Sequence, residues 1–135
     1  MLRLLFGAFI VLHGLVHLLY FGQGRRLFEL RPGMVWPDGS WAFSKLLGDE
    51  ATRWLASLSY ALAAIGFVVG GIGILVGQAW WRPVVVVSAA FSAAIVLLFW
   101  DGKMRKLDDQ GLIALLINGA ILVAVLILHW PDLGF

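Results

Sequence analysis

Four long runs of apolar residues alternate with charged segments along the chain. The runs cover residues 4–22, 54–77, 83–100 and 112–130, so each is 18 to 24 residues long. A helix rises about 1.5 Å per residue, so the shortest run would reach about 27 Å, close to the roughly 30 Å hydrocarbon core of a bilayer. We therefore predict an all-α fold in which residues 1–135 form one transmembrane domain, a polytopic four-helix bundle with both termini on the same side.

The composition also indicates a membrane protein. Hydrophobic residues make up 61% and charged residues 13% of the 135 positions, and the mean hydropathy is +0.93. A soluble domain carries roughly 25% charged residues. These values exclude a soluble globular domain, a disordered tail and a nucleic-acid-binding module, and they make the lipid bilayer the expected partner. The chain has no cysteine, which excludes disulfides and thiolate metal sites.

The Lys and Arg residues predict an orientation. With four spans, one side of the membrane would carry only Arg3 and Arg82. The other side would carry Arg25, Arg26, Arg31, Lys45, Arg53, Lys103, Arg105 and Lys106. Because positively charged loops stay in the cytoplasm, we expect loops 23–53 and 101–111 to be cytoplasmic and both termini to lie outside, in a cell membrane of the bacterial inner-membrane type.

The first loop, 23–53, is long for a connection in a compact domain. Its segment 41–47, which includes Trp41, has the composition of a short interfacial stretch that lies on the membrane surface. Asp49 is the expected N-cap of the second helix. The tryptophans lie in loops or near the ends of the apolar runs, which predicts aromatic belts at the two membrane surfaces. They are Trp36, Trp41, Trp54, Trp80, Trp81, Trp100 and Trp130.

The second run carries small residues spaced alternately by three and four positions, so that they share one helix face. The stripe includes Ser59, Ala63, Gly66, Gly70, Gly73 and Gly77. Small residues let two helices approach closely in lipid. We predict that the stripe is a helix-packing groove inside the bundle, with a homodimer seam as the alternative.

Polar residues at mid-membrane depth are the candidate site. His13 and His17 are four residues apart, so they lie on one helix face, and Tyr20 follows on the same stripe. At about 1.5 Å per residue, both histidines, Ser92 and Asn118 lie about 13 to 20 Å below the outer ends of their spans. Ionisable residues inside a span usually face protein or water and often serve a function.

Three functions remain open for this polar layer. In the first, it binds a small quinone-like or lipid-like ligand in a non-catalytic, redox-associated membrane subunit. In the second, His13 and His17 bind a metal or a haem, although a zinc site would need further ligands that the spans lack. In the third, the layer only holds together an accessory subunit of a larger membrane complex. No catalytic constellation is present, so we do not expect an enzyme, and no cofactor follows directly from the residues.

The chain resembles the DoxX-like group of small four-helix membrane proteins. The resemblance rests on the opening Arg3-Leu4-Leu5-Phe6-Gly7, the long first loop, the Gly70-Gly71-Ile72-Gly73 segment and the small residues of the third run. Some members of that group are associated with quinone-linked sulfur oxidation, so the resemblance implies a redox-associated, quinone-facing role. No site residue of the group corresponds to His13 or His17, and none is carried over.

Overall fold

The computed structural model describes residues 1–135 and is entirely helical, without strands. Its α-helices are α1 (Leu2–Gly24), α2 (Ser44–Leu75), α3 (Trp81–Leu98) and α4 (Leu112–Leu122), and two short elements, η1 (Leu107–Gln110) and η2 (Val123–Ile127), flank α4. The predicted all-α fold with four helices is confirmed. Helices α1, α2 and α3 are long and apolar enough to cross a membrane.

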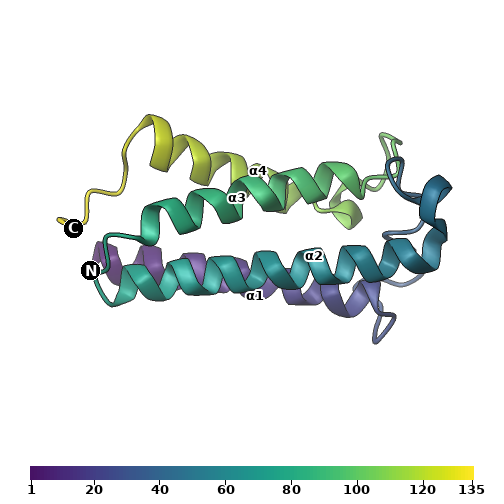
Figure 1. Cartoon of the computed structure of the whole chain (residues 1–135), viewed down its shortest axis with the longest axis horizontal. Helices are drawn as coiled ribbons and strands as arrows, with labels where there is room; N and C mark the ends of the chain where they lie inside the picture. Colours follow the sequence, from purple (N-terminus) through teal and green to yellow (C-terminus); the bar gives the residue numbers. More distant parts are fainter.

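The helices run up and down in chain order, and each packs against the next one. Both termini lie at one end of the bundle, whereas the long loop and the α3–α4 connection lie at the other (Figure 1). Helix α1 packs along α2, α2 along α3 and α3 along α4, whereas α1 and α4 meet mainly through side chains, such as Ile10 and Ile121 of the core. The bundle is therefore less closely packed along this side.

The helix ends differ from the predicted limits for local reasons. Helix α1 extends by two residues at each end, to Leu2 and Gly24. Helix α2 ends at Leu75 rather than residue 77, because Gly77 adopts a left-handed conformation (φ +75°) that closes the helix. The fourth helical stretch ends at Ile127 rather than residue 130. The residue before Pro131 is biased away from helical geometry, so the helix stops short of it.

Helix α3 covers residues 81–98 rather than the predicted 83–100, and the long loop binds its last carbonyls. The Ser40 hydroxyl donates to Leu98 O at 2.7 Å, and the Trp41 indole N–H donates to Leu97 O at 2.7 Å. The Trp41 backbone N–H also donates to Trp100 O at 2.9 Å. These bonds attach the loop to the end of α3.

The beginning of α2 also differs from the prediction. Helical structure starts at Ser44, inside the predicted interfacial segment 41–47, and is interrupted at Gly48 (φ +79°). Only glycine adopts this backbone conformation freely. The predicted N-cap role of Asp49 is wrong, because its carboxylate accepts a hydrogen bond from Gly39 N at 3.0 Å, a residue of the long loop.

Glycines set the close contacts between the helices. Gly66, Gly70 and Gly73 of the predicted stripe face α3, where an added Cβ would collide with Ser88, Val85 or Trp80. The stripe is therefore covered by α3 of the same chain. The two ends of the stripe do not take part in this contact. The Ser59 hydroxyl donates to Leu55 O of its own helix, and Gly77 lies beyond the end of α2. Ala63 is buried at 1% exposure.

A second glycine contact joins α1 and α2 and was not predicted. A Cβ on Gly71 would lie 2.9 Å from Val11 N and 3.0 Å from Gly7 O. A Cβ on Gly14 would lie 3.1 Å from Ala64 O. The two backbones approach closely at these positions, and this fixes α1 against α2.

The aromatic belts are only partly present. Trp41, Trp54, Trp80 and Trp130 are exposed near the ends of the bundle, as expected for interfacial residues. Trp36 and Trp81 are instead buried, at 3% and 0% exposure. Trp81 packs edge-on against Phe6 of α1, with ring centroids 5.9 Å apart, so it belongs to the core.

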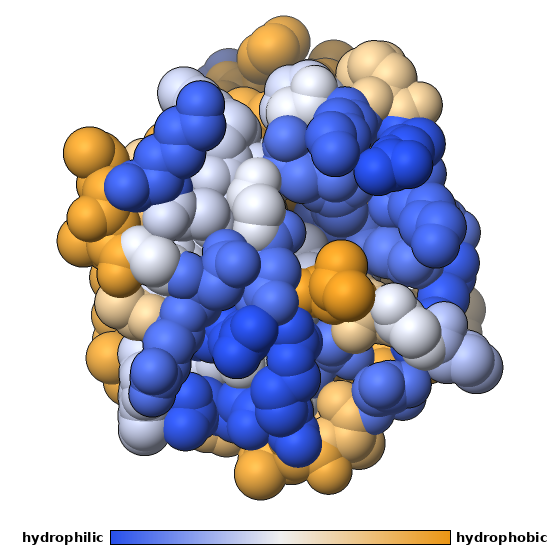
Figure 2. Space-filling view, turned by 90° about the vertical axis from the view of Figure 1, so that its right-hand side faces the viewer, coloured by the Kyte–Doolittle hydropathy of each residue, from blue (hydrophilic) through white to orange (hydrophobic).

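The surface separates into an apolar wall and a polar end. Large hydrophobic side chains are exposed along the sides of the helices, for example Leu12, Leu62, Val87 and Leu116. The end that carries the loops is largely hydrophilic and has hydrophobic atoms around its rim (Figure 2). This distribution is the one expected of a protein whose sides contact lipid.

Candidate functional site

Four polar side chains from three helices form one hydrogen-bonded cluster in the middle of the bundle. His13 Nε2 lies 2.8 Å from Asn118 Oδ1, and Asn118 Nδ2 donates to Ser92 Oγ at 2.7 Å. Ser92 Oγ lies 2.6 Å from His17 Nε2, and His17 Nδ1 donates to the His13 carbonyl oxygen at 2.8 Å. We call His13, His17, Ser92 and Asn118 the polar cluster.

The polar cluster is almost completely enclosed. His13 is 5% exposed and His17 is 1% exposed, while Ser92 and Asn118 are fully buried. The two imidazole rings meet edge to face, with centroids 5.1 Å apart, and Phe67 of α2 packs against both. The cluster bridges α1, α3 and α4, and its His13–Asn118 bond joins α1 directly to α4.

Tyr20 lies outside the polar cluster, although the sequence placed it on the same stripe as the histidines. Its ring stacks on Tyr60, with centroids 5.2 Å apart, and its hydroxyl donates to Asp108 O at 3.4 Å. Tyr20 therefore contacts the connection between α3 and α4, toward the loop end of the bundle.

A groove of about 400 Å³ occupies the gap between α1 and α4. Val16, Leu19 and Tyr20 line it from α1, and Ile113 and Ile117 line it from α4. His13 lies at its inner end. Val16 and Ile113 are 43% and 59% exposed, so the groove is open along the apolar side of the molecule. Its walls are mostly apolar, and its polar lining residues are His13, Tyr20, Arg31, Asp108 and Asp109.

An ion-pair network closes the loop end of this groove. Arg31 of the long loop pairs with Asp108, and its Nη1 lies 3.1 Å from Asp109 Oδ1. The hydrogen bond from Arg31 holds the pKa of the Asp108 carboxyl below its ordinary value. Both side chains of the Arg31–Asp108 pair are about half exposed, so the pair is expected to weaken at high salt.

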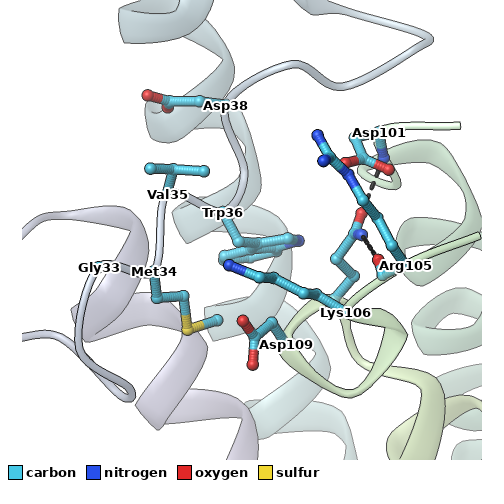
Figure 3. Close-up of a pocket in the computed structure, with 10 residues that line it drawn as sticks. Gly33, Met34, Val35, Trp36, Asp38, Asp101, Arg105, Lys106 and Asp109 are labelled. Atoms are coloured by element: carbon cyan, nitrogen blue, oxygen red, sulfur yellow. Dashed lines mark hydrogen bonds between the residues drawn. The ribbon is translucent and has the colours of Figure 1, made fainter. Parts of the chain in front are cut away.

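A second, smaller pit of about 160 Å³ opens at the loop end (Figure 3). Trp36 lies at its centre in the view, and its indole nitrogen has no hydrogen-bond partner. Arg105 and Lys106 line the pit without forming an ion pair, whereas Asp38 is paired with Arg26 and Arg53. The pit is thus polar and shares little with the apolar groove.

The hydrogen bonds of His13 and His17 disfavour the predicted metal or haem site. Three of the four ring nitrogens are already held in hydrogen bonds, and only His13 Nδ1 has no partner in the chain. A metal or haem bound by both rings would have to break part of the cluster. No group of three or more His, Asp or Glu side chains is placed to hold a metal ion.

Two residues that shape the long loop escaped the sequence analysis. Gln23 is fully buried at the end of α1, where its amide donates to Met34 O at 3.0 Å and accepts from Leu30 N at 2.9 Å. Arg26 donates to Val35 O and to Trp36 O, both at 2.7 Å. Both residues lie just after the first apolar run, and this position could have indicated that they cap the helix end and bind the loop. These bonds fold the loop over the end of the bundle.

Comparisons with protein-family models, curated proteins and solved structures found no match to the chain.

Proposed function

We propose that this protein is a four-span membrane protein that binds a small amphipathic, lipid-like molecule in the groove between α1 and α4. The observation that carries the proposal is the groove between α1 and α4, which is open to the side, has mostly apolar walls and reaches His13 of the polar cluster. Ligand sites are typically concave and mostly apolar, with a few polar groups that fix the orientation of the ligand.

The membrane assignment rests on the three long apolar helices and the exposed apolar wall. The fourth span would be the continuous α4–η2 stretch, 112–127. At about 1.5 Å per residue it extends about 24 Å. It is somewhat shorter than the hydrocarbon core, and a bilayer can accommodate such a mismatch by thinning locally. The charge distribution supports cytoplasmic loops and outside termini in a membrane of the bacterial inner-membrane type.

The chemistry of the site supports binding rather than catalysis. The polar cluster holds no carboxylate and no activated nucleophile, and its side chains are hydrogen-bonded to one another. A lipid-like molecule, or a quinone-like molecule in its reduced, hydroxyl-bearing form, fits the apolar walls. A role as a membrane subunit with a redox-linked partner, which the DoxX-like resemblance implies, remains a prediction.

Filling the groove tests the proposal. Val16 lines the groove at 43% exposure, and Val69 on α2 is a matched control at 42% exposure that lies outside it. Native mass spectrometry of protein purified in mild detergent should show a small-molecule adduct on the wild type. We expect Val16→Trp to lose that adduct and Val69→Trp to keep it. Adduct-free wild type, or equal loss in both variants, would contradict the proposal.

A further inference from the structure

We infer that the inner end of the groove recognises a hydrogen-bond donor, so that its ligand is an apolar molecule with a hydroxyl or an un-ionised carboxyl group rather than a carbonyl compound. This inference rests on the proposed function of the groove and names the chemistry of its ligand. It follows from the directions of the hydrogen bonds in the polar cluster.

The surroundings of the two imidazoles determine their charge. Neither His13 nor His17 forms an ion pair or a hydrogen bond with a carboxylate, and both are at least 95% buried. A buried charge without a partner costs several kcal/mol. Each ring is therefore neutral and has one N–H donor and one bare nitrogen acceptor.

The backbone fixes the tautomer of His17. Its Nδ1 lies 2.8 Å from the His13 carbonyl oxygen, which can only accept, so the proton is on Nδ1. Nε2 is then bare and can only accept. The Ser92 hydroxyl, 2.6 Å away, must donate to it.

The hydrogen bonds of Ser92 and Asn118 fix the tautomer of His13. With its proton directed at His17, Ser92 Oγ accepts from Asn118 Nδ2 at 2.7 Å. The amide oxygen of Asn118 therefore faces His13 Nε2 at 2.8 Å and accepts from it. The proton of His13 is on Nε2, and its Nδ1 is a bare acceptor. The two histidines are thus opposite tautomers.

His13 Nδ1 is the one ring nitrogen of the cluster without a hydrogen-bond partner in the chain. His13 lines the inner end of the groove. A ligand that donates an O–H to Nδ1 completes the chain of bonds, whereas a ketone or quinone oxygen would face a lone pair.

Two probes of nearly equal shape test this inference. 4-Heptylphenol carries an O–H donor, and in 4-heptylanisole a methyl group replaces that proton. Against the wild type in nanodiscs, we expect the anisole to bind about tenfold more weakly, the loss of one neutral hydrogen bond. His13→Phe should remove this preference, and His129→Phe, which changes an exposed histidine outside the groove, should keep it.

The outcomes separate the two proposals. Equal binding of both probes that Val16→Trp abolishes would overturn the donor requirement and leave the groove as a binding site. Tighter binding of 4-heptylbenzaldehyde, which has a carbonyl acceptor and no donor, would also overturn the requirement. Binding of neither probe would overturn the groove proposal and the inference together.

Nitrogen-15 NMR of the histidine rings tests the tautomers without any variant at the cluster. His129 is exposed and outside the cluster, so a His129→Gln background simplifies the spectrum. We expect one Nδ1–H tautomer and one Nε2–H tautomer, and 4-heptylphenol should shift only the bare Nδ1 of the second. Two rings of the same tautomer, or a protonated ring at pH 7, would overturn the inference.

Discussion

Ser92 holds the polar cluster together, because its single hydroxyl contacts both His17 and Asn118. It is fully buried on α3 and is the only member of the cluster from that helix. Without it, the ring nitrogen of His17 and the amide of Asn118 would each lose a partner. Ser88, one turn earlier, instead donates to Val84 O of its own helix at 2.7 Å.

This difference predicts the effect of two similar substitutions. Ser92→Ala should lower the free energy of unfolding by about 1–2 kcal/mol, because it leaves two buried polar groups unpaired. Ser88→Ala should change it by less than about 0.5 kcal/mol, because a bond from serine to its own helix adds little stability. Unfolding titrations with SDS in mixed micelles measure both values. Equal losses would show that the cluster does not contribute beyond ordinary packing.

For individual residues, the sequence predicted which polar side chains lie at the same membrane depth, but not which of them form hydrogen bonds with one another. Counting the rise per residue from the span ends placed His13, His17, Ser92 and Asn118 at similar depths, and the structure joins them by hydrogen bonds. The spacing along the helix grouped Tyr20 with the histidines, although its hydroxyl contacts Asp108. Depth and helix face leave open which neighbouring helix a side chain meets.

Between elements, glycine determines how closely the helices approach. Gly71 places α2 against the backbone of α1, where a Cβ would lie 2.9 Å from Val11 N. Backbone atoms cannot move aside as a flexible side chain can. Gly119 on α4 has no atom within 4 Å of an added Cβ, so it is a glycine without a packing role.

The two glycines should therefore respond in opposite directions to the same substitution. Gly71→Ala should destabilise the protein by about 1–3 kcal/mol, because overpacking forces the helices apart. Gly119→Ala should stabilise it by up to about 1 kcal/mol, because alanine favours the helix. Thermal unfolding in detergent compares the two variants. A neutral Gly71→Ala would contradict the close approach of α1 and α2.

The helices themselves were predictable, and their irregular ends were not. Length and hydropathy located four helices to within a few residues at most ends, because charged residues limit each apolar run. The early start of α2 at Ser44 and its interruption at Gly48 were missed, since Lys45, Asp49 and Glu50 lie there and no apolar run marks the helix. Nor does any pattern in α1 or α4 show that a groove lies between these two helices.

For the whole molecule, the charged loops define one end and the termini the other (Figures 1 and 2). Eight of the ten Lys and Arg residues belong to the loop end or the segments that flank it. If the bundle crosses the membrane, positive charge favours the cytoplasm for this end. The orientation of the bundle in the membrane therefore depends on charges throughout the chain, and chemical labelling at the two ends can test it.

The absence of cysteine from the chain makes that test direct. Single cysteines at the exposed positions Gln78, between α2 and α3, and Lys103, at the loop end, report the two sides. In intact spheroplasts a membrane-impermeant maleimide should label Gln78→Cys, and Lys103→Cys should react only after permeabilisation. The reverse pattern would contradict cytoplasmic loops, and labelling of both would argue against a membrane-spanning bundle.

The most direct measurement of the central claim is photolabelling of the groove. An alkylphenol with a diazirine on its alkyl chain is added to the protein in nanodiscs, cross-linked by light and mapped by peptide mass spectrometry. The account predicts labels concentrated on Val16 and Leu19 of α1 and on Ile113 and Ile117 of α4, which line the groove. Labels spread evenly over exposed wall residues such as Leu62, Val69 and Val87 would contradict it, because the probe would then only partition into lipid.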